Sequence, residues 1–330
     1  MRHRQKELVG KQHLSLFDQL LSVSAEELEF ELREPIAVPW SDFLLNPRRL
    51  RGSDFLMRWS QGAWSEKRLI QAINQTGRYY ALMYGPSSVA PGDNIREHEL
   101  YFERLEQAGL RDLKRPDILI FKHSDREIIT NTVDNLGGVR ELPFTPEKEM
   151  AELLVRAVLA VECENSLWIA KQMPSYGEQL RPMRRLGGQL GFPKNAVLPT
   201  VIIKEEDRER LFVWQKQTSI AIHIWHAFYD LAFGLSLDKA QELINNGKIE
   251  PTIQTFQAPG GAVSEKVIYK FYYHYAYRLG ESQEEPNLVA AHIVDKNGHI
   301  LPYVRFEGGS FTMHSEALAV LDHEASRKSS

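Results

Sequence analysis

The stretch that decides the fold is Leu159–Asn165, LAVECEN, an apolar run of strand character that carries two carboxylates one residue apart. In an extended chain successive side chains point to opposite faces, so Glu162 and Glu164 share one face. Val161 and Cys163 then point to the other. Two carboxylates on the same face of a buried strand repel each other and lose hydration unless a cation lies between them. A bound divalent metal supplies that cation, and the alternative is an edge strand whose charged face lies in water.

The composition is that of a soluble globular protein of 330 residues, 43% hydrophobic and 25% charged, a length that suits one large or two small domains. No apolar segment approaches the roughly 18 residues that cross a bilayer, and residues 1–11 have no apolar signal core. Cys163 is the only cysteine, which excludes an internal disulfide and predicts a cytoplasmic protein. With 40 basic and 44 acidic residues the net charge is -4, so a nucleic-acid-binding role requires a local basic patch.

Hydrophobic periodicity and turn residues predict an α/β (α+β) fold in which a mixed central sheet is flanked by helices. Strands are expected at residues 115–121, 159–165, 197–204 and 219–224, with a polar loop or small excursion at 122–146 and a hairpin of 288–294 with 300–306. Helices are expected at residues 13–31, 66–76 with Ser65 as cap, 94–109, 145–154 and 205–217. Residues 1–62 are expected to form a helical or irregular region, and residues 63–330 the remaining domain, with β-rich additions at its C-terminal end.

The strands that carry Asp117 and Glu162 are expected to pair, and paired strands lie only about 5 Å apart. Their carboxylates can therefore converge on one ion. Ligation by a few oxygen atoms suits Mg²⁺, which keeps most of its waters and takes one or two carboxylates plus a substrate phosphate. An ion in that position polarises a phosphodiester and lowers the pKa of an attacking water.

Pro116-Asp117 followed by Glu162-Cys163-Glu164 resembles the PD-(D/E)xK nuclease motif, in the variant whose final lysine is replaced by Glu. The order of strands and helices over residues 93–204 is similar to the core of that fold. The segments YALMYGPSSVAP, ELYFERLEQAGL and RPDILIF also resemble type II restriction endonucleases. The resemblance implies a prokaryotic, Mg²⁺-dependent homodimer that hydrolyses double-stranded DNA at a short, palindromic sequence.

On this resemblance Asp117 and Glu162 would be metal ligands, with the carbonyl of Cys163 as a third oxygen. Glu164 stands where the family has lysine, and it would position the attacking water or act as its general base. The chain departs from the family in this missing lysine and in the long gap between Asp117 and Glu162. Lys171 is therefore a candidate for the catalytic cation.

Two further carboxylates, Glu149 and Glu152, lie on the helix expected before the strand at 159–165. Either one would add a ligand to the site. The alternative for both of them, and for Lys171, is a charge that lies in water on a helix surface.

A local basic patch is expected downstream of the motif. Arg181, Arg184 and Arg185 fall at i, i+3 and i+4 of a helix expected to begin near Pro182, and Lys194 follows. A positive stripe beside a carboxylate site suits a DNA phosphate backbone. The alternative is a helix face that is merely solvated.

Other site classes have weaker support. His292, Asn297 and His299 match a histidine–asparagine nuclease, but the turn of a hairpin explains Asn297-Gly298 better. His223 and His226 lack a third ligand for zinc, and the chain has no phosphate-binding glycine motif, so no nucleotide cofactor is expected. The competing function is a non-catalytic DNA-binding or assembly protein on a nuclease-like fold.

Overall fold

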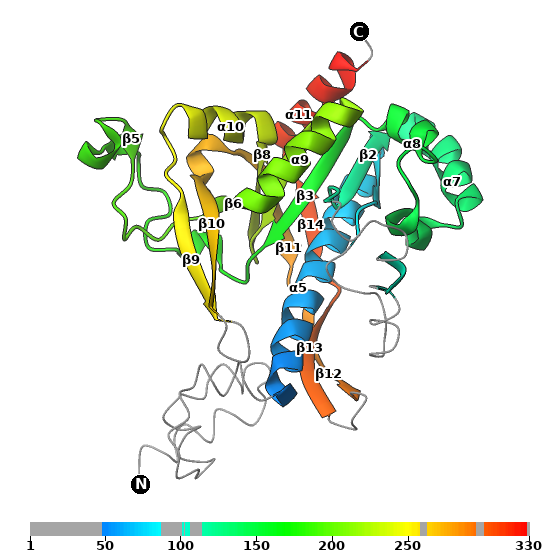
Figure 1. Ribbon diagram of the computed structural model, residues 1–330, viewed down its shortest axis with the longest axis horizontal. Coiled ribbons are helices and arrows are strands. Elements are labelled where there is room, and N and C mark those ends of the chain that lie inside the picture. Colours follow the sequence, from blue (N-terminus) through cyan, green and yellow to red (C-terminus); the bar gives the residue numbers. More distant parts are fainter. Residues whose placement is uncertain are drawn as a thin grey trace.

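The computed structural model describes residues 48–86, 101, 103–105, 114–257, 263–294 and 300–328. Its centre is a seven-stranded mixed sheet with helices on both faces (Figure 1). The strand order is β1 (Tyr79–Met83), β2 (Ile118–Lys122), β3 (Leu159–Asn165), β7 (Ile222–Ala227), β8 (Leu231–Ser236), β11 (Tyr277–Glu284) and β14 (Ser310–Met313). Strands β3 and β7 pair in parallel, and the other neighbours are antiparallel. The expected mixed sheet with flanking helices is confirmed.

Each face of this sheet packs into its own hydrophobic cluster. Helices α5 (Arg48–Gln75) and α11 (Ser315–Arg327) cover the face that carries Leu159 and Val161. The face that carries Ala160 packs against α7 (Arg126–Asn135), α8 (Ala151–Arg156), α9 (Glu205–Thr218) and α10 (Leu237–Asn245). Because side chains alternate along β3, Glu162 and Glu164 belong to the Ala160 face.

A smaller sheet of β6 (Thr200–Lys204), β10 (Val263–Tyr272) and β9 (Thr252–Gln257) lies beside the central one. Its buried side chains, among them Val201, Ile203 and Phe271, enter the same core as Ala160. The alternate residues of β6, including Lys204, point to the opposite face of this small sheet.

The remaining elements are short or lie at the periphery. The hairpin of β12 (Asn287–Val294) and β13 (Ile300–Glu307) packs against α5, and β4 (Arg181–Pro182) pairs with β5 (Leu190–Gly191). Short 3₁₀ helices occur at η2 (His123–Asp125), η3 (Val139–Phe144), η4 (Ala170–Gln172), η5 (Arg184–Leu186) and η6 (Tyr273–Tyr275). No helix within the described ranges is both long and apolar enough to cross a membrane.

Several expected elements are confirmed with small shifts of their ends. Strand β3 has the expected bounds, while β2, β6 and β7 each begin three residues later than expected. Helix α9 and the β12–β13 pairing are also confirmed. The helix expected at 13–31 and most of the one at 94–109 lie outside the described residues.

Three expectations on helices are wrong. Ser65 does not begin a helix, because α5 begins at Arg48 and runs through both Ser65 and the expected domain boundary at residue 62. Residues 126–135, within the span expected as a loop or small excursion, form the helix α7, because Ile129 and Val133, four apart, bury one side of an otherwise polar segment. The helix expected at 145–154 is reduced to α8, since a turn occupies residues 147–150.

Candidate functional site

The register between β2 and β3 places Asp117 beside Glu162. Ile118 lies opposite Val161, and the backbone N–H of Asp117 donates to the carbonyl of Val161 at 2.8 Å. The backbone N–H of Cys163 donates to Oδ2 of Asp117 at 2.7 Å. The expected pairing of these strands is confirmed, and it fixes the Asp117 carboxylate next to the C-terminal half of β3.

Glu162 is buried, and only one of its two carboxylate oxygens has a partner among the described residues. Its side chain is 4% exposed, and its Oε1 lies 2.5 Å from Nζ of Lys114. Its Oε2 has no hydrogen-bond partner among the described residues. A buried carboxylate oxygen without a partner is unfavourable, so the position has room for one more cation or donor.

Glu164 faces a second lysine. Lys204 ends β6, and its Nζ lies 3.4 Å from Oδ2 of Asp207 at the start of α9. Burial raises the pKa of Glu164 to about 7, although Lys204 and Lys114 act against this shift. Near neutral pH Glu164 therefore exists in both its protonated and its ionised form, as a general base requires.

A fourth carboxylate, Glu66, approaches from α5 on the other face of the sheet. Burial raises its pKa to about 8, with a further contribution from the negative charge of Asp117. Nothing in the local sequence separates Glu66 from an ordinary solvated helix residue. Its proximity to Asp117 arises only when α5 packs on β3.

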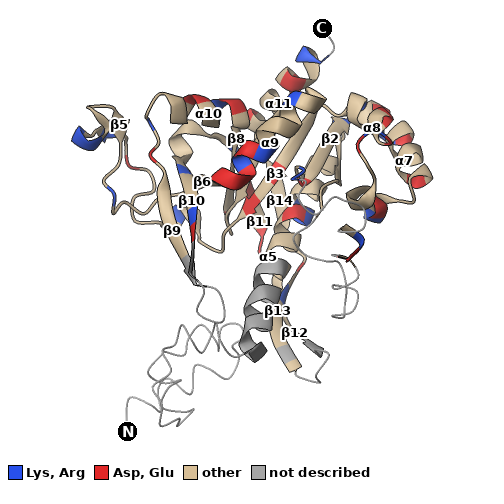
Figure 2. Cartoon of the chain, viewed as in Figure 1, with Lys and Arg blue, Asp and Glu red and all other residues tan. Residues whose placement is uncertain are grey.

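The carboxylates of the cluster outnumber the lysines beside them, and the shifts in their pKa values reflect this imbalance. Burial raises the pKa of Asp117, and burial followed by the charge of Asp117 raises that of Glu162 well above its ordinary value. Burial would lower the pKa of Lys114, but the charges of Glu162 and Asp117 outweigh burial and raise it. Within the described residues, five carboxylates, those of Glu66, Asp117, Glu162, Glu164 and Asp207, thus lie near two lysines, Lys114 and Lys204. Figure 2 shows acidic and basic segments meeting where β6 leads into α9.

The side chains suit a hard divalent cation in kind, because all the candidate ligands are carboxylate oxygens and one of these oxygens lacks a partner. They are not arranged as a finished coordination shell: no group of three or more His, Cys, Asp or Glu side chains in the described part of the chain converges as metal ligands. Lys114 instead occupies one side of the Glu162 carboxylate. The carbonyl of Cys163 stays a predicted ligand.

The structure does not bring Lys171 to the carboxylates. Lys171 lies in η4, where its Nζ is 3.4 Å from Glu281 and its backbone N–H donates to Asp230 at 3.1 Å. Lys114 and Lys204 are the lysines next to the site, and they come from segments that the family motif does not include. Glu149 and Glu152 are exposed, as a solvated helix charge would be.

The expected basic helix does not form. Arg181 lies in the two-residue strand β4, and Arg184 and Arg185 lie in the single turn η5, which ends at Gly187 with a φ of 64°. Arg181 and Arg184 are exposed, whereas Arg185 is held in an ion pair with Glu250 and donates to the carbonyl of Phe192 at 2.7 Å. The short Arg184–Leu186 turn therefore cannot present three arginines on one helix face.

Lys194 is exposed and lines a pocket of about 800 Å³ beside the small sheet. This pocket also exposes Lys248 and Lys270, which the expected DNA-binding set did not contain. The positive charge near the site is thus spread over several loops and strands rather than along a helix.

The two histidines of β7 do not form a zinc site. Three residues apart on a strand, His223 and His226 point to opposite faces. Nδ1 of His223 lies 2.8 Å from the hydroxyl of Tyr277, and burial lowers the pKa of both histidines to about 3. His292 lies in β12, and residues 297 and 299 are outside the described ranges.

No known protein-family model, curated protein or solved structure matches this chain. The likeness to PD-(D/E)xK nucleases therefore rests on the motif residues and on their placement.

Proposed function

We propose that the protein is a divalent-metal-dependent endonuclease that hydrolyses double-stranded DNA, in the manner of a type II restriction enzyme acting as a homodimer on a short palindromic site. One observation carries the proposal: Asp117 lies beside Glu162 on paired strands with Glu164 next on the same face, and Oε2 of Glu162 has no partner among the described residues. Such a concentration of buried negative charge is stable only with a cation beside it.

Asp117 and Glu162 would hold Mg²⁺, with Glu66 as a further carboxylate that the motif does not include. When bound, Mg²⁺ supplies Lewis-acid polarisation of the phosphodiester and a lower pKa for the attacking water. Glu164, whose pKa burial raises to about 7 in the metal-free protein, would accept the proton of that water. Lys114 and Lys204 offset the negative charge that gathers on the phosphoryl oxygens.

One observation favours the competing function, a DNA-binding or assembly protein without catalysis. Lys114 already pairs with Glu162 at 2.5 Å, so the carboxylates are partly neutralised in the absence of metal. Such a protein would bind DNA without cutting it and would show no dependence on divalent ions.

Incubation of plasmid DNA with the protein, with and without Mg²⁺, separates the two functions. We expect discrete fragments that appear only with Mg²⁺, and the sequences of their ends give the recognition site. Intact plasmid at high protein concentration, in buffers with Mg²⁺ or Mn²⁺, would contradict the nuclease proposal.

The variants Asp117→Asn and Glu162→Gln keep side-chain volume and remove a ligand charge. We expect each to lower the rate of cleavage by at least about 100-fold, because the metal is lost or misplaced. Binding of the same DNA should change by less than about threefold, since contacts to the backbone lie elsewhere. Glu149→Gln, an exposed carboxylate outside the cluster, is the matched control and should cut at the normal rate.

A further inference from the structure

The pocket of about 800 Å³ beside the small sheet lies next to the carboxylate cluster. Asn165 and Ser166, which directly follow Glu164, form part of its wall, and so does His226, which is opposite Glu164 in the β3–β7 register. Thr200 and Ile202 line it from β6, on the face that also carries Lys204. The pocket therefore adjoins the end of β3 that carries Glu164.

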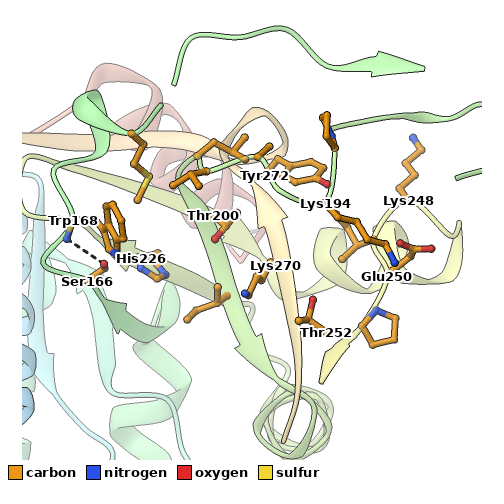
Figure 3. Close-up of a pocket in the computed structure, with 18 of the residues that line it drawn as sticks. Ser166, Trp168, Lys194, Thr200, His226, Lys248, Glu250, Thr252, Lys270 and Tyr272 are labelled. Carbon is orange, nitrogen blue, oxygen red and sulfur yellow. Dashed lines mark hydrogen bonds between the residues drawn. The ribbon is translucent and has the colours of Figure 1, made fainter. Parts of the chain in front are cut away.

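The charges around the pocket favour an anion. Three lysines line it, Lys194, Lys248 and Lys270, and none forms an ion pair with a carboxylate in the described part of the chain. Among the described residues of the lining Glu250 is the acidic one, and Arg185 neutralises it. In Figure 3, Lys270 and Thr200 lie in the middle of the pocket, between Trp168 and His226 at one end and Lys194, Lys248 and Glu250 at the other.

The end of the pocket nearest the carboxylates is aromatic. Trp168 is 59% exposed there, an unusual position for so large an apolar side chain. The ring of His226 stacks on Phe228 with centroids 4.5 Å apart and planes at 25°. His226 and Phe228 are buried, so it is the exposed ring of Trp168 on which a nucleobase can stack without regard to sequence.

His226 adds a hydrogen-bonding group with no partner. Its side chain is 3% exposed, and neither Nδ1 nor Nε2 has a hydrogen-bond partner among the described residues. Burial lowers its pKa to about 3, so the ring is neutral and offers one donor and one acceptor. Buried polar groups are rarely left without a partner. Because the two ring nitrogens point in diverging directions, a polar group of a ligand in the pocket would pair with one of them.

We propose that this pocket binds a single nucleotide, with its base at Trp168 and His226 and its phosphate at Lys270. The volume lies within the range of small-ligand sites. Resting on the proposed nuclease function, the nucleotide is one that turns out of the DNA stack beside the scissile phosphate. A free mononucleotide has the same chemistry, and the experiment distinguishes the two sources.

The first arm uses the four deoxynucleoside 5′-monophosphates, titrated into the metal-free protein by calorimetry. We expect at least one of them to bind, with an affinity reduced about tenfold or more in Lys270→Ala and in Trp168→Ala. Lys216→Ala removes the same charge from the exposed side of α9, outside the pocket, and should bind normally. Equal binding by all four proteins would place the nucleotide elsewhere and overturn the proposal.

The second arm uses plasmid DNA with Ca²⁺ in place of Mg²⁺, treated with permanganate and chloroacetaldehyde, which modify unstacked bases. Modification that requires the protein and is lost in Trp168→Ala identifies DNA as the source. Binding of mononucleotides without such modification identifies a free nucleotide as the source. Absence of both signals overturns the proposal.

His226→Phe keeps the stack on Phe228 and removes both ring nitrogens. We expect the differences in affinity among the four mononucleotides to shrink to within about twofold, because the pocket can then no longer read the edge of the base. An unchanged order of affinities would overturn this role of His226.

The two proposals fail separately. A protein that cuts plasmid with Mg²⁺ but gives neither signal is a nuclease without this pocket function. A protein that binds mononucleotides at Lys270 but cuts no DNA supports the nucleotide site and contradicts the nuclease proposal.

Discussion

Lys114 is the residue that most directly links the electrostatics of the site to its chemistry. Its Nζ lies 2.5 Å from Oε1 of Glu162, and the neighbouring Asp117 carboxylate also raises its pKa. A divalent ion bound by Asp117 and Glu162 would neutralise the same charge. Ion binding and the Lys114–Glu162 pair therefore compete, and a lysine released from Glu162 is free to approach a phosphate.

Lys114→Met tests this competition. We expect Mg²⁺ to bind about tenfold more tightly, because a positive charge next to its ligands is gone. Cleavage should nevertheless fall at least about 100-fold, because the charge that offsets the phosphoryl oxygens is lost. Calorimetry with Mg²⁺ and plasmid cleavage measure the two effects, with Lys216→Met as the control. Unchanged Mg²⁺ affinity would show that the lysine and the ion do not share the carboxylates.

The sequence predicts only some of these site residues, for a physical reason. Glu162 and Glu164 are recognisable because the alternation of a strand sets which side chains share a face. Asp117 follows from the pairing of consecutive strands. Glu66 and Lys204 come from a helix and a strand end, where a charged residue is indistinguishable from a solvated one until the elements pack.

The segment that carries Asp117 is held from two sides by neighbouring elements. The N–H of Tyr84, at the end of β1, donates to the carbonyl of Asp117 at 2.8 Å. The guanidinium of Arg115 is clamped by Glu147 at 2.6 Å and by the carbonyl of Thr145 at 2.8 Å. A side-chain Cβ at Gly85 would lie 2.4 Å from the carbonyl oxygen of Pro116, so glycine is required for this close approach.

Gly85→Ala should push the Pro116–Asp117 backbone away from β1. We expect a loss of about 1–3 kcal/mol in the free energy of unfolding, measured in urea, since the contact is with backbone that cannot yield. The rate of cleavage should fall by more than the loss of folded protein explains, because Asp117 moves relative to Glu162. Gly62→Ala is the matched control: its Cβ would be 3.4 Å from Nδ2 of Asn165, an ordinary contact in a helix, so it should be neutral or slightly stabilising. Equal losses in both variants would mean that the approach at Gly85 is not special.

At the level of elements, the hydrophobic periodicity of the sequence predicts helices and strands, and tertiary packing decides which of them form. Strand β3 buries its first four residues, Leu159 to Glu162, and α9 buries Leu211 and Trp214, three residues apart, against the core. The arginines at 181, 184 and 185 have helical spacing, but Pro182 and the two glycines at 187 and 188 leave too few residues between them for a helix. Spacing alone was insufficient there, because such a short segment forms no stable helix unless tertiary contacts support it.

The candidate site joins both layers of the molecule at the ends of β2 and β3. Glu66 comes from α5 on one face, whereas Lys204 and Asp207 come from β6 and α9 on the other. Folding therefore concentrates carboxylates that are far apart and hydrated in the unfolded chain. The stability of the whole molecule is then linked to the protons and cations that this site binds.

Burial raises the pKa of Glu66 to about 8 and that of Glu164 to about 7, from an ordinary value of 4.5. Between pH 4.5 and these raised values the folded chain keeps protons that the unfolded chain has released. The protonated carboxyls therefore contribute stability that is complete below about pH 4.5 and is lost as pH rises through 7 and 8. In EDTA we expect the Tm to fall between pH 6 and pH 9. Mg²⁺ should raise the Tm at pH 8.5 and have little effect at pH 5.5, where protons occupy the carboxylates.

Glu164→Gln removes one of these titrating groups, and its effect on stability should therefore depend on pH. In EDTA at pH 8.5 it should be more stable than the natural chain by roughly 1–3 kcal/mol, because one buried charge is gone. Below about pH 4.5 the two should be alike, since Glu164 is then protonated in both the folded and the unfolded chain. Glu152→Gln changes an exposed carboxylate and serves as the control. If the Tm curves of the two variants coincide from pH 6 to pH 9, Glu164 does not titrate in that range and cannot be the base that accepts the proton of the attacking water.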